Sequence, residues 1–456
     1  MTDNKLLEGK KRLHFIGIGG SGMYPIVQIL HAAGYEITGS DVNEGDIIDY
    51  ERAMGIRVFI PHAAENIKGA DLIVYSAAIM PGNPEMEEAE RLGIPRIERS
   101  VMLGYVASLY QKPVCIAGTH GKTSTTAMTA QALLMCGKDP AAVIGGKLPY
   151  IGGYGKSGRD ESIVVESCEY HNTFLELTPY YAVLLNIDND HLEFFGSMDN
   201  LKAAFRKFCA SATGAVLYNG DDENSRQALA GLEKKCVTFG LSDGCDYRAV
   251  NVTLKKPGFF QFDVAVTGKA PVHVSLGVPG RHHIYNALAC FAVCSLLGCA
   301  PQDIAQGIAA FGGAGRRFEV LGHVGGVTIA DDYAHHPTEL EATLKAAKEM
   351  GFHQVWAVFQ PFTFSRTKML LDDFARVLSI ADHVVMTEIM GSRETNDSYQ
   401  VYTKDLAAKI PGSVWFDTFE EVAGYTMSHA QQNDLVITLG CGDVYKAAKL
   451  MLKYNA

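Results

Sequence analysis

The chain has 456 residues, of which 47 % are hydrophobic and 20 % are charged, and its formal net charge is −11. At roughly 150 residues per domain, this length suggests about three domains. The ordinary globular composition excludes disordered, collagen-like and disulfide-stapled chains, and the acidic balance argues against a nucleic-acid partner. No apolar run approaches the ~20 residues of a membrane span. The polar N-terminus does not resemble a signal peptide, so we expect a cytoplasmic protein without a membrane partner.

The 10 cysteines are scattered along the chain and form no C-x-x-C pair. This distribution predicts reduced thiols, as in the cytoplasm, and does not favour a cysteine zinc site.

The first 105 residues or so alternate short apolar runs with helical patterns. Strands are predicted at residues 13–18, 36–39 and 71–76, and a helix at residues 23–33. This alternation indicates parallel strands joined by helical crossovers.

A glycine-rich turn follows the first predicted strand. Gly17, Gly19 and Gly22 form G-x-G-x-x-G, and Asp41 follows Gly19 by 22 residues. The spacing is that of a dinucleotide fingerprint, although any nucleotide diphosphate offers the same phosphate geometry. A purely structural glycine turn is the alternative.

A second α/β unit begins at Pro113, with strands predicted at residues 114–118, 162–165 and 182–187 and helices at 124–136 and 280–297. Residues 237–278 alternate in a β pattern with tight turns, which predicts an antiparallel addition. The first strand runs into AGTHGKTSTT, a turn whose N–H groups can face phosphate oxygens. Lys122 can reach the β- and γ-phosphates and Thr123 can bind Mg²⁺, although Ile116 stands where the general ATPase pattern requires glycine.

Acidic side chains and a histidine follow two later strands of this unit. Glu166 and Glu169 follow one strand, and Asp188, Asp190 and His191 follow another. Glu166 and the Thr123 hydroxyl are suited to one magnesium ion, and His191 to a second. For Asp188 and Asp190 alone, a solvated turn is the favoured interpretation.

A third α/β unit begins near Gly315, with strands predicted at residues 327–330, 355–359, 383–387 and 435–439 and a helix at 337–350. Three motifs adjoin these strands: GAGRRFE at 313–319, DDYAHHP at 331–337 and FQPFTFSRTK at 359–368. Adjacent arginines in a glycine context suit phosphate. Arg366 and Lys368 are suited to a carboxylate, with a basic surface turn as the alternative. The chain has no G-x-S-x-G or H-E-x-x-H motif and no cysteine framed as a nucleophile, so covalent hydrolase chemistry has no support.

Taken in order, these segments resemble the Mur ligase family over essentially the whole chain. The similar motifs are HFIGIGGSGM, GYEITGSD, AGTHGKTSTT, NIDNDHLEFFG, GRHHIYNA, GAGRRFEVLG, DDYAHHPTELEATLKAAK, FQPFTFSRTK and ITLGCGDVY. The resemblance implies an α/β fold of three consecutive domains. They are a Rossmann-like UDP-sugar domain at 1–108, a P-loop-type ATP-binding domain with an added β-sheet at 109–313, and a Rossmann-like domain at 314–456.

The resemblance also implies ATP-dependent amide-bond formation in peptidoglycan precursor synthesis, with ATP and Mg²⁺ as cofactors. UDP-N-acetylmuramate and L-alanine would be the substrates, and the protein a monomer or homodimer. The implied ATP-binding residues are Gly118, Thr119, His120, Gly121, Lys122, Thr123, Ser124, Asn286, Arg317 and Asp332, and the implied magnesium ligands are Thr123, Glu166 and His191. Gly19, Ser21, Gly22 and Asp41 would hold the UDP-sugar. Lys122, His335 and Arg366 would be catalytic, the last two placing the amino acid.

The chain departs from the family pattern at His283, at residues 170–173, at Phe362 and at Thr363. Three alternatives remain open: a related ligase that adds another amino acid or a peptide, an NAD-dependent oxidoreductase based on the glycine turn and Asp41, and a nucleotide-binding regulator without turnover.

Overall fold

The structure is a computed structural model that describes residues 6–392 and 394–454. The chain divides into two compact units. The first runs up to Val250 and includes Val264–Val272 and Tyr285–Ile308. The second comprises Asn251–Asp263, His273–Ile284 and the chain from Ala309 onward. None of the helices within the described residues is long and apolar enough to cross a bilayer.

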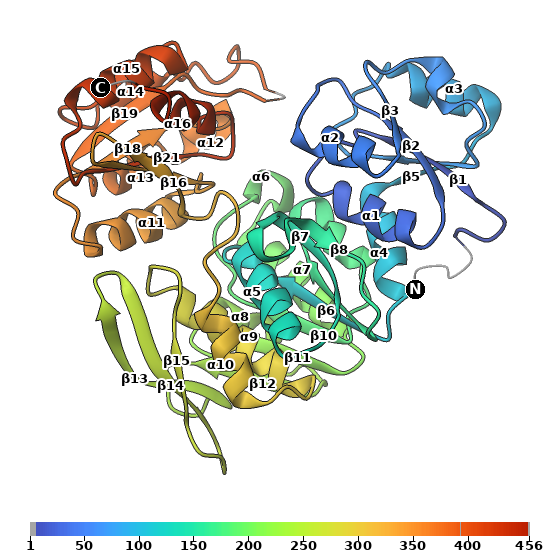
Figure 1. Ribbon diagram of the computed structural model, residues 1–456, viewed down its shortest axis with the longest axis horizontal. Coiled ribbons are helices and arrows are strands. Elements are labelled where there is room, and N and C mark those ends of the chain that lie inside the picture. Colours follow the sequence, from blue (N-terminus) through green and yellow to red (C-terminus); the bar gives the residue numbers. More distant parts are fainter. Residues whose placement is uncertain (1–5, 393, 455–456) are drawn as a thin grey trace. The chain divides into compact units, whose positions relative to one another are not determined.

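The N-terminal sheet has five parallel strands in the order β3-β2-β1-β4-β5 (Figure 1). Its strands are β1 (Arg12–Ile16), β2 (Glu36–Ser40), β3 (Arg57–Phe59), β4 (Leu72–Tyr75) and β5 (Arg96–Glu98). The connecting helices are α1 (Tyr24–Ala32), α2 (Asp46–Ala53), η1 (Ala64–Ile67), α3 (Pro84–Leu92) and α4 (Arg99–Ser108). The strand order reverses at β1, so the glycine turn after β1 lies at the switch point, where open α/β sheets bind ligands.

The central sheet has ten strands in the order β15-β14-β13-β12-β11-β10-β6-β9-β7-β8. Its strands are β6 (Lys112–Ala117), β7 (Ala141–Leu148), β8 (Gly153–Lys156), β9 (Ser162–Glu166), β10 (Tyr181–Leu184), β11 (Ala215–Asn219), β12 (Cys236–Gly240), β13 (Tyr247–Lys256), β14 (Phe259–Val266) and β15 (Val272–Ser275). The helices are α5 (Lys122–Met135), η2 (Pro149–Ile151), η3 (Tyr170–Glu176), α6 (Leu192–Phe195), α7 (Met198–Ala210), α8 (Glu223–Leu229), α9 (His283–Leu296) and α10 (Pro301–Ala309).

The expectation of an antiparallel addition from residue 237 is wrong at its first strand, because β12 pairs in parallel with both β11 and β13. The tight turns in this region raised the expectation of antiparallel pairing, whereas α8 supplies a crossover into β12 that makes parallel pairing possible.

The C-terminal sheet has six strands in the order β16-β17-β21-β18-β19-β20, parallel except for the β16–β17 pair. Its strands are β16 (Glu319–Val324), β17 (Val327–Asp332), β18 (Val355–Phe359), β19 (His383–Thr387), β20 (Val414–Phe416) and β21 (Leu435–Leu439). The helices are α11 (Pro337–Glu349), α12 (Phe364–Met369), α13 (Leu371–Leu378), α14 (Thr403–Ala407), α15 (Phe419–His429) and α16 (Tyr445–Met451). The predicted α/β class with largely parallel sheets is confirmed.

Burial explains why β6 and α5 form the centre of the first unit. Val114, Cys115, Ile116 and Ala117 of β6 are fully buried, and α5 packs on β6, β7 and β9. A strand covered on both faces needs a continuous apolar run, which this segment supplies. The rigid pair of elements fixes the turn between them.

Candidate active site

The turn between β6 and α5 depends on two glycines with left-handed backbone conformation. Gly118 has φ +138° and Gly121 has φ +85°. A Cβ at Gly121 would lie 2.7 Å from Oδ1 of Asn286, and one at Gly118 would lie 3.0 Å from Cβ of Leu185. Other residues are therefore strained at both positions, so glycine is required at 118 and 121 for the turn to close against its neighbours.

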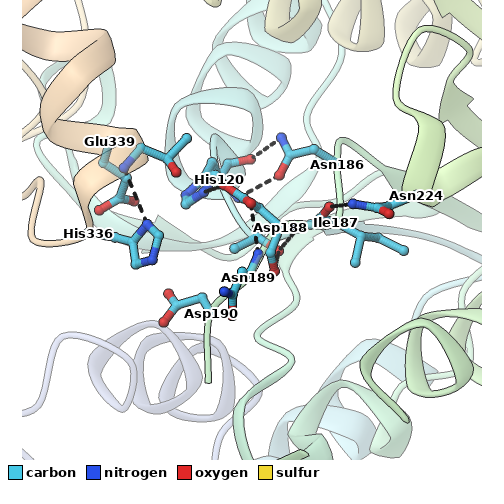
Figure 2. A network of polar contacts seen from close by, with 12 residues as sticks. His120, Asn186, Ile187, Asp188, Asn189, Asp190, Asn224, His336 and Glu339 are labelled. Carbon is cyan, nitrogen blue, oxygen red and sulfur yellow. Dashed lines mark hydrogen bonds and ion pairs between the residues drawn. The ribbon is translucent and has the colours of Figure 1, made fainter. Parts of the chain in front are cut away.

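The segment after β10 fastens this turn in place (Figure 2). The carbonyl and side-chain oxygens of Asn186 accept hydrogen bonds from the N–H groups of Thr119 (3.1 Å) and His120 (2.8 Å), respectively. Its side-chain amide donates to the carbonyl of His120 at 3.1 Å. Asn186 thus acts as a clamp that fixes the direction of the loop N–H groups.

Asp188 also belongs to this loop rather than to a solvated turn. Its backbone N–H donates to the Thr119 hydroxyl at 2.9 Å, and its Oδ2 lies 2.9 Å from Nε2 of His120. The favoured solvated-turn interpretation of Asp188 is therefore wrong. Local sequence favoured it because an isolated acidic turn gives no sign of a partner 68 residues away.

Lys122 begins α5 with its ammonium held over the turn. Nζ donates to the carbonyls of Gly118 (2.7 Å) and Thr119 (3.0 Å), and it lies 2.9 Å from Oε2 of Glu169. Burial alone would lower the pKa of Lys122, but the nearby Glu169 carboxylate outweighs burial and raises the pKa above its ordinary value. The lysine is therefore a fixed positive charge at the start of the helix.

Thr123, which follows this lysine in the sequence, and Glu166, at the end of β9, form a pair of oxygen ligands. The Thr123 hydroxyl donates to Oε1 of Glu166 at 2.8 Å, and Oε2 of Glu166 accepts from the N–H of Gly145 at 2.7 Å. A Cβ at Gly145 would lie 2.7 Å from both carboxylate oxygens. A hydroxyl and a carboxylate at this separation are the donor types that Mg²⁺ takes from proteins.

His191 lies at the start of α6 with a left-handed backbone, φ +58°. Its ring centroid is 4.6 Å from that of Tyr170, and its Nε2 is 3.7 Å from Oδ2 of Asp190. The imidazole of His191 thus lies against the Tyr170 ring and near the Asp190 carboxylate.

Ser124 and Asn286 complete the predicted nucleotide residues of this unit. Ser124 is buried in the first turn of α5, and Asn286 lies in the first turn of α9 with its amide oxygen directed at Gly121. Helices α5 and α9 therefore both start at the same loop.

The glycine turn after β1 is closed by Asp41 and by the end of β2. The carbonyl of Ser40 accepts from the N–H groups of Gly17 (2.8 Å) and Ile18 (3.0 Å), and Oδ2 of Asp41 accepts from that of Gly19 (3.0 Å). A Cβ at Gly19 would lie 2.7 Å from Cδ1 of Ile48. A side chain at Gly19 would overlap Ile48, so this position of the turn is left without one.

Ser21 is exposed on the same turn, and Gly22 approaches a cation that the sequence did not single out. A Cβ at Gly22 would lie 3.4 Å from a guanidinium nitrogen of Arg99, the first residue of α4. A positive side chain beside a glycine turn is suited to a diphosphate.

In the second unit, Arg317 and Asp332 share one polar cluster. The guanidinium of Arg317 lies 5.1 Å from the Tyr333 ring centroid, and Asp332 accepts hydrogen bonds of 2.7 Å from the N–H groups of Phe318 and Ala334. Burial raises the pKa of Asp332 to about 6, against the opposing charge of Arg317. The preceding residue, Arg316, binds a different carboxylate: its Nε donates to Oδ2 of Asp331 at 2.8 Å.

His335 and Arg366 lie on two segments of this unit. Nδ1 of His335 is 3.1 Å from the carbonyl of Tyr333 and 3.3 Å from Oε2 of Glu339. Arg366 lies in α12, which follows Thr363 in a left-handed backbone conformation. Burial raises the pKa of the Cys441 thiol, and the positive charge of Arg366 opposes that rise. A ring nitrogen facing a carboxylate is the arrangement that orients a proton-accepting histidine.

Comparison with known proteins identifies the family. Three family descriptions match in order: "Mur ligase family, catalytic domain" at residues 12–111, "Mur ligase middle domain" at 116–294 and "Mur ligase, glutamate ligase domain" at 316–442. The chain belongs to the Mur ligase family.

Curated relatives align over nearly the full length of the chain. A UDP-N-acetylmuramate–L-alanine ligase of Caldanaerobacter subterraneus is 42 % identical over 455 residues, covering 98 % of this chain and 99 % of the relative. The ligase of the same name from Alkaliphilus metalliredigens is 40 % identical, covering 97 % of each chain. The crystal structure of a UDP-N-acetylmuramate–alanine ligase from Thermotoga maritima superimposes with a TM-score of 0.82 at 28 % identity, covering 97 % of this chain and 98 % of that one.

Membership of the Mur ligase family makes the protein an ATP-dependent amide-bond-forming ligase. The shortened glycine loop that fails the general ATPase pattern lies within the region that matches the Mur ligase middle domain. The NAD-dependent oxidoreductase alternative no longer has support, because the glycine turn and Asp41 belong to the first of the matched Mur ligase regions.

Two side chains of the described sites are not among the residues predicted from the sequence. Asn186 clamps the phosphate loop, and Arg99 adjoins the glycine turn. Asn186 stands at the end of a predicted strand, where ligand-facing residues are expected, and that position is the cue that could have found it.

Proposed function

We propose that the protein joins L-alanine to UDP-N-acetylmuramate with hydrolysis of ATP, a step in peptidoglycan precursor synthesis. The observation that carries this proposal is the full-length similarity to ligases of that name, at 42 % and 40 % identity. A murein peptide ligase from Psychrobacter arcticus has the same fold with a TM-score of 0.77, but its identity is 22 %. A single amino acid is therefore favoured over a preformed peptide as the second substrate.

The proposed reaction has two steps. A carboxylate oxygen of the sugar nucleotide attacks the γ-phosphorus of ATP, ADP leaves, and an acyl phosphate forms. The amine of alanine then attacks the acyl carbon, the carbon–oxygen bond to phosphate breaks, and the amine gives up a proton. The products are the amide, ADP and inorganic phosphate.

The first step brings the carboxylate of the sugar nucleotide up to the triphosphate of ATP, and the repulsion between these anions explains why the assigned residues include cations. Two unit charges ~4 Å apart repel by ~4 kcal/mol at an effective dielectric of ~20, and each ~1.4 kcal/mol changes a rate tenfold. We assign Lys122 and the glycine loop of residues 118–124 at the start of α5 to the triphosphate of ATP. Arg317, Asp332 and Asn286 are assigned to the remainder of the nucleotide. Fixed charges and aligned dipoles of this kind need no rearrangement during the reaction.

Thr123, Glu166 and His191 are assigned to magnesium. The hydroxyl and carboxylate oxygens of the first two residues, 2.8 Å apart, are of the type this ion prefers. When bound, the ion neutralises charge on the phosphate oxygens. Glu166 is held by Gly145 and Thr123, so its oxygens are already oriented before an ion arrives.

The remaining residues are assigned to the two other substrates. Gly19, Ser21, Gly22 and Asp41 would hold the UDP-sugar, since their turn lies at the switch point of the first sheet and its glycines let a ligand approach the backbone closely. His335 and Arg366 would place the amino acid, the arginine by its carboxylate and the histidine near its amine.

The test is phosphate release by the purified protein with UDP-N-acetylmuramate, ATP, magnesium and a panel of L-alanine, glycine, L-serine and an L-alanyl peptide. We expect release that requires all components, L-alanine as the best acceptor, and a product whose mass equals the sugar nucleotide plus alanine minus water. A higher kcat/KM for the peptide would assign the murein peptide reaction instead. Phosphate release without the sugar nucleotide would contradict the proposal.

A further inference from the structure

Glu85 is fully buried in the first turn of α3, and its two carboxylate oxygens have three hydrogen-bond donors. Oε2 accepts from the Ser40 hydroxyl at 2.5 Å. Oε1 accepts from the side-chain amide of Asn66 at 2.7 Å and from the N–H of Ala63 at 3.3 Å. Since a buried charge is tolerated only where such donors compensate it, this network determines where the Glu85 carboxylate lies.

Two histidines adjoin the same carboxylate. Nε2 of His14, in the middle of β1, lies 3.5 Å from Oε2 of Glu85, and its Nδ1 lies 2.8 Å from the hydroxyl of Thr38 on β2. Nδ1 of His62 lies 3.5 Å from Oε2 of Glu85 and 2.8 Å from the Ser40 hydroxyl. Burial alone would raise the pKa of Glu85, but His14 and the hydroxyl and amide donors outweigh burial and lower the pKa. The carboxylate therefore keeps its charge and joins β1, β2 and the segment after β3 to the start of α3.

Ser40 is the last residue of β2 and connects this network to the glycine turn after β1. Its hydroxyl donates to Glu85, while its carbonyl accepts from the N–H groups of Gly17 (2.8 Å) and Ile18 (3.0 Å). Oδ2 of the next residue, Asp41, accepts from the following N–H of the turn at 3.0 Å. A shift of Ser40 would therefore displace both of the acceptors that hold the turn.

We infer that Glu85 is a positioning residue for the sugar nucleotide, an inference that rests on the proposed function. The carboxylate fixes the Ser40 side chain, and the Ser40 backbone in turn fixes the glycine turn in the conformation that receives the diphosphate. A turn that is ordered before its ligand arrives binds more tightly, because the apparent Kd rises as the fraction of the binding-competent conformation falls. Glu85 thus contributes to affinity through Ser40 and not through a contact of its own with the ligand.

Two substitutions interrupt this connection at different points. Glu85→Gln keeps the shape of the side chain but replaces one acceptor oxygen by a donor amide, so that Ser40 and Asn66 compete for the oxygen that remains. Ser40→Ala removes only the hydroxyl and carries the test if Glu85→Gln does not fold. Titration calorimetry of the full-length protein without ATP, with UDP-N-acetylmuramate and with UDP alone, measures binding without turnover. We expect each variant to bind both compounds at least about tenfold more weakly, which corresponds to a turn that is ordered about a tenth of the time.

The double variant Ser40→Ala/Glu85→Gln shows whether the two residues act together. Because Glu85 acts through Ser40, the double variant should bind about as weakly as the weaker single variant, whereas independent effects would add to about a hundredfold. The matched control is Asp71→Asn. Asp71 also accepts from three donors, the N–H groups of Lys11 and Arg12 and the Arg12 guanidinium, but at the start of β1, the opposite edge of the same sheet. Asp71→Asn should lower the melting temperature and leave the Kd within about twofold.

Initial rates separate positioning from a general loss of structure. In Glu85→Gln the KM for UDP-N-acetylmuramate should rise in parallel with the Kd, while the KM for ATP and the kcat at saturating sugar nucleotide stay within about twofold. Unchanged binding in both single variants, or an equal loss in Asp71→Asn, would overturn the positioning role of Glu85 and leave the proposed function standing. A wild-type protein that does not bind UDP-N-acetylmuramate would instead overturn the proposed function, and the positioning role with it.

Discussion

Replacing Gly121 by alanine is the sharpest perturbation of the phosphate loop. The substitution adds one carbon, removes no polar group and leaves Lys122 in place. That carbon would lie 2.7 Å from Oδ1 of Asn286, closer than side chains tolerate, and the backbone at this position has φ +85°. Two separate costs therefore act on a single methyl group.

The first cost is backbone strain, about 1–2 kcal/mol for an L-residue held in the left-handed region. The second is the overlap with Asn286, which is buried in the first turn of α9 and cannot swing into solvent. Forcing an extra carbon into a packed site costs about 1–3 kcal/mol. We therefore expect Gly121→Ala to lose about 2–5 kcal/mol of loop or global stability.

Gly137 offers a matched control at the other end of α5. It has φ +77°, close to that of Gly121, but a Cβ there would meet nothing within 4 Å. Gly137→Ala should therefore lose only the strain of about 1–2 kcal/mol and leave the phosphate loop intact.

The assay compares melting temperature and the KM for ATP in the two variants. Gly121→Ala should raise the KM for ATP at least about tenfold, the equivalent of ~1.4 kcal/mol, and Gly137→Ala should leave the KM within about twofold. If both variants lose the same stability and keep the same KM, the packing of Asn286 against the loop does not constrain nucleotide binding, and the reasoning fails.

Three further predictions address charge. Lys122→Ala should lose ATP-dependent phosphate release, and its melting temperature should fall because the buried Glu169 carboxylate loses its partner. The double variant Lys122→Ala/Glu169→Gln should regain the stability but not the turnover. Restored turnover in that variant would contradict the phosphate role of Lys122. Glu166→Ala should raise the magnesium concentration needed for half-maximal rate by about tenfold, whereas an unchanged requirement would remove Glu166 from the metal site. The raised pKa of Asp332, about 6 in place of 3.8, means that the folded state binds more protons than the unfolded state between those values. Stability should therefore fall as pH rises from about 4 to about 6, by up to ~3 kcal/mol. Asp332→Asn should flatten the plot of melting temperature against pH over this range. An unchanged slope would refute the assignment of this pH dependence to Asp332.

The sheet elements near the site could be predicted because their sequence signals are local. Residues 114–118 predicted β6, and the observed strand is Lys112–Ala117, since a continuous apolar run bounded by Pro113 and Gly118 suits a strand covered on both faces. Helix α5 is found at Lys122–Met135, where the expectation was residues 124–136.

Other elements escaped prediction for physical reasons. Pro84 is the first residue of α3, whose N–H groups at Glu85 and Met86 are capped by Asn83. Proline suits that position because the first helical N–H has no partner within the helix. A proline alone does not distinguish a chain break from a helix start, and the capping asparagine is the cue that decides.

The site residues also differ in whether a local sequence signal or a long-range contact determines their place. The glycines at 118 and 121 could be predicted from their own conformational needs, but the clamp by Asn186 joins positions 66 residues apart. Such a pairing depends on β10 lying beside β6, which no local pattern specifies. Long-range register thus determines which strand-end residues reach the loop.

The structure also adds to what the sequence predicts for Lys122. The sequence assigns the lysine to phosphate, but its ammonium already has three oxygen partners, the carbonyls of Gly118 and Thr119 and the carboxylate of Glu169. These partners reduce the net charge that an arriving triphosphate meets, and so they weaken ground-state attraction. They also hold the ammonium at the start of α5, so little reorganisation remains when charge develops on the transferring phosphoryl group. Because catalysis depends on interactions that strengthen in the transition state, such a held lysine favours turnover over tight binding.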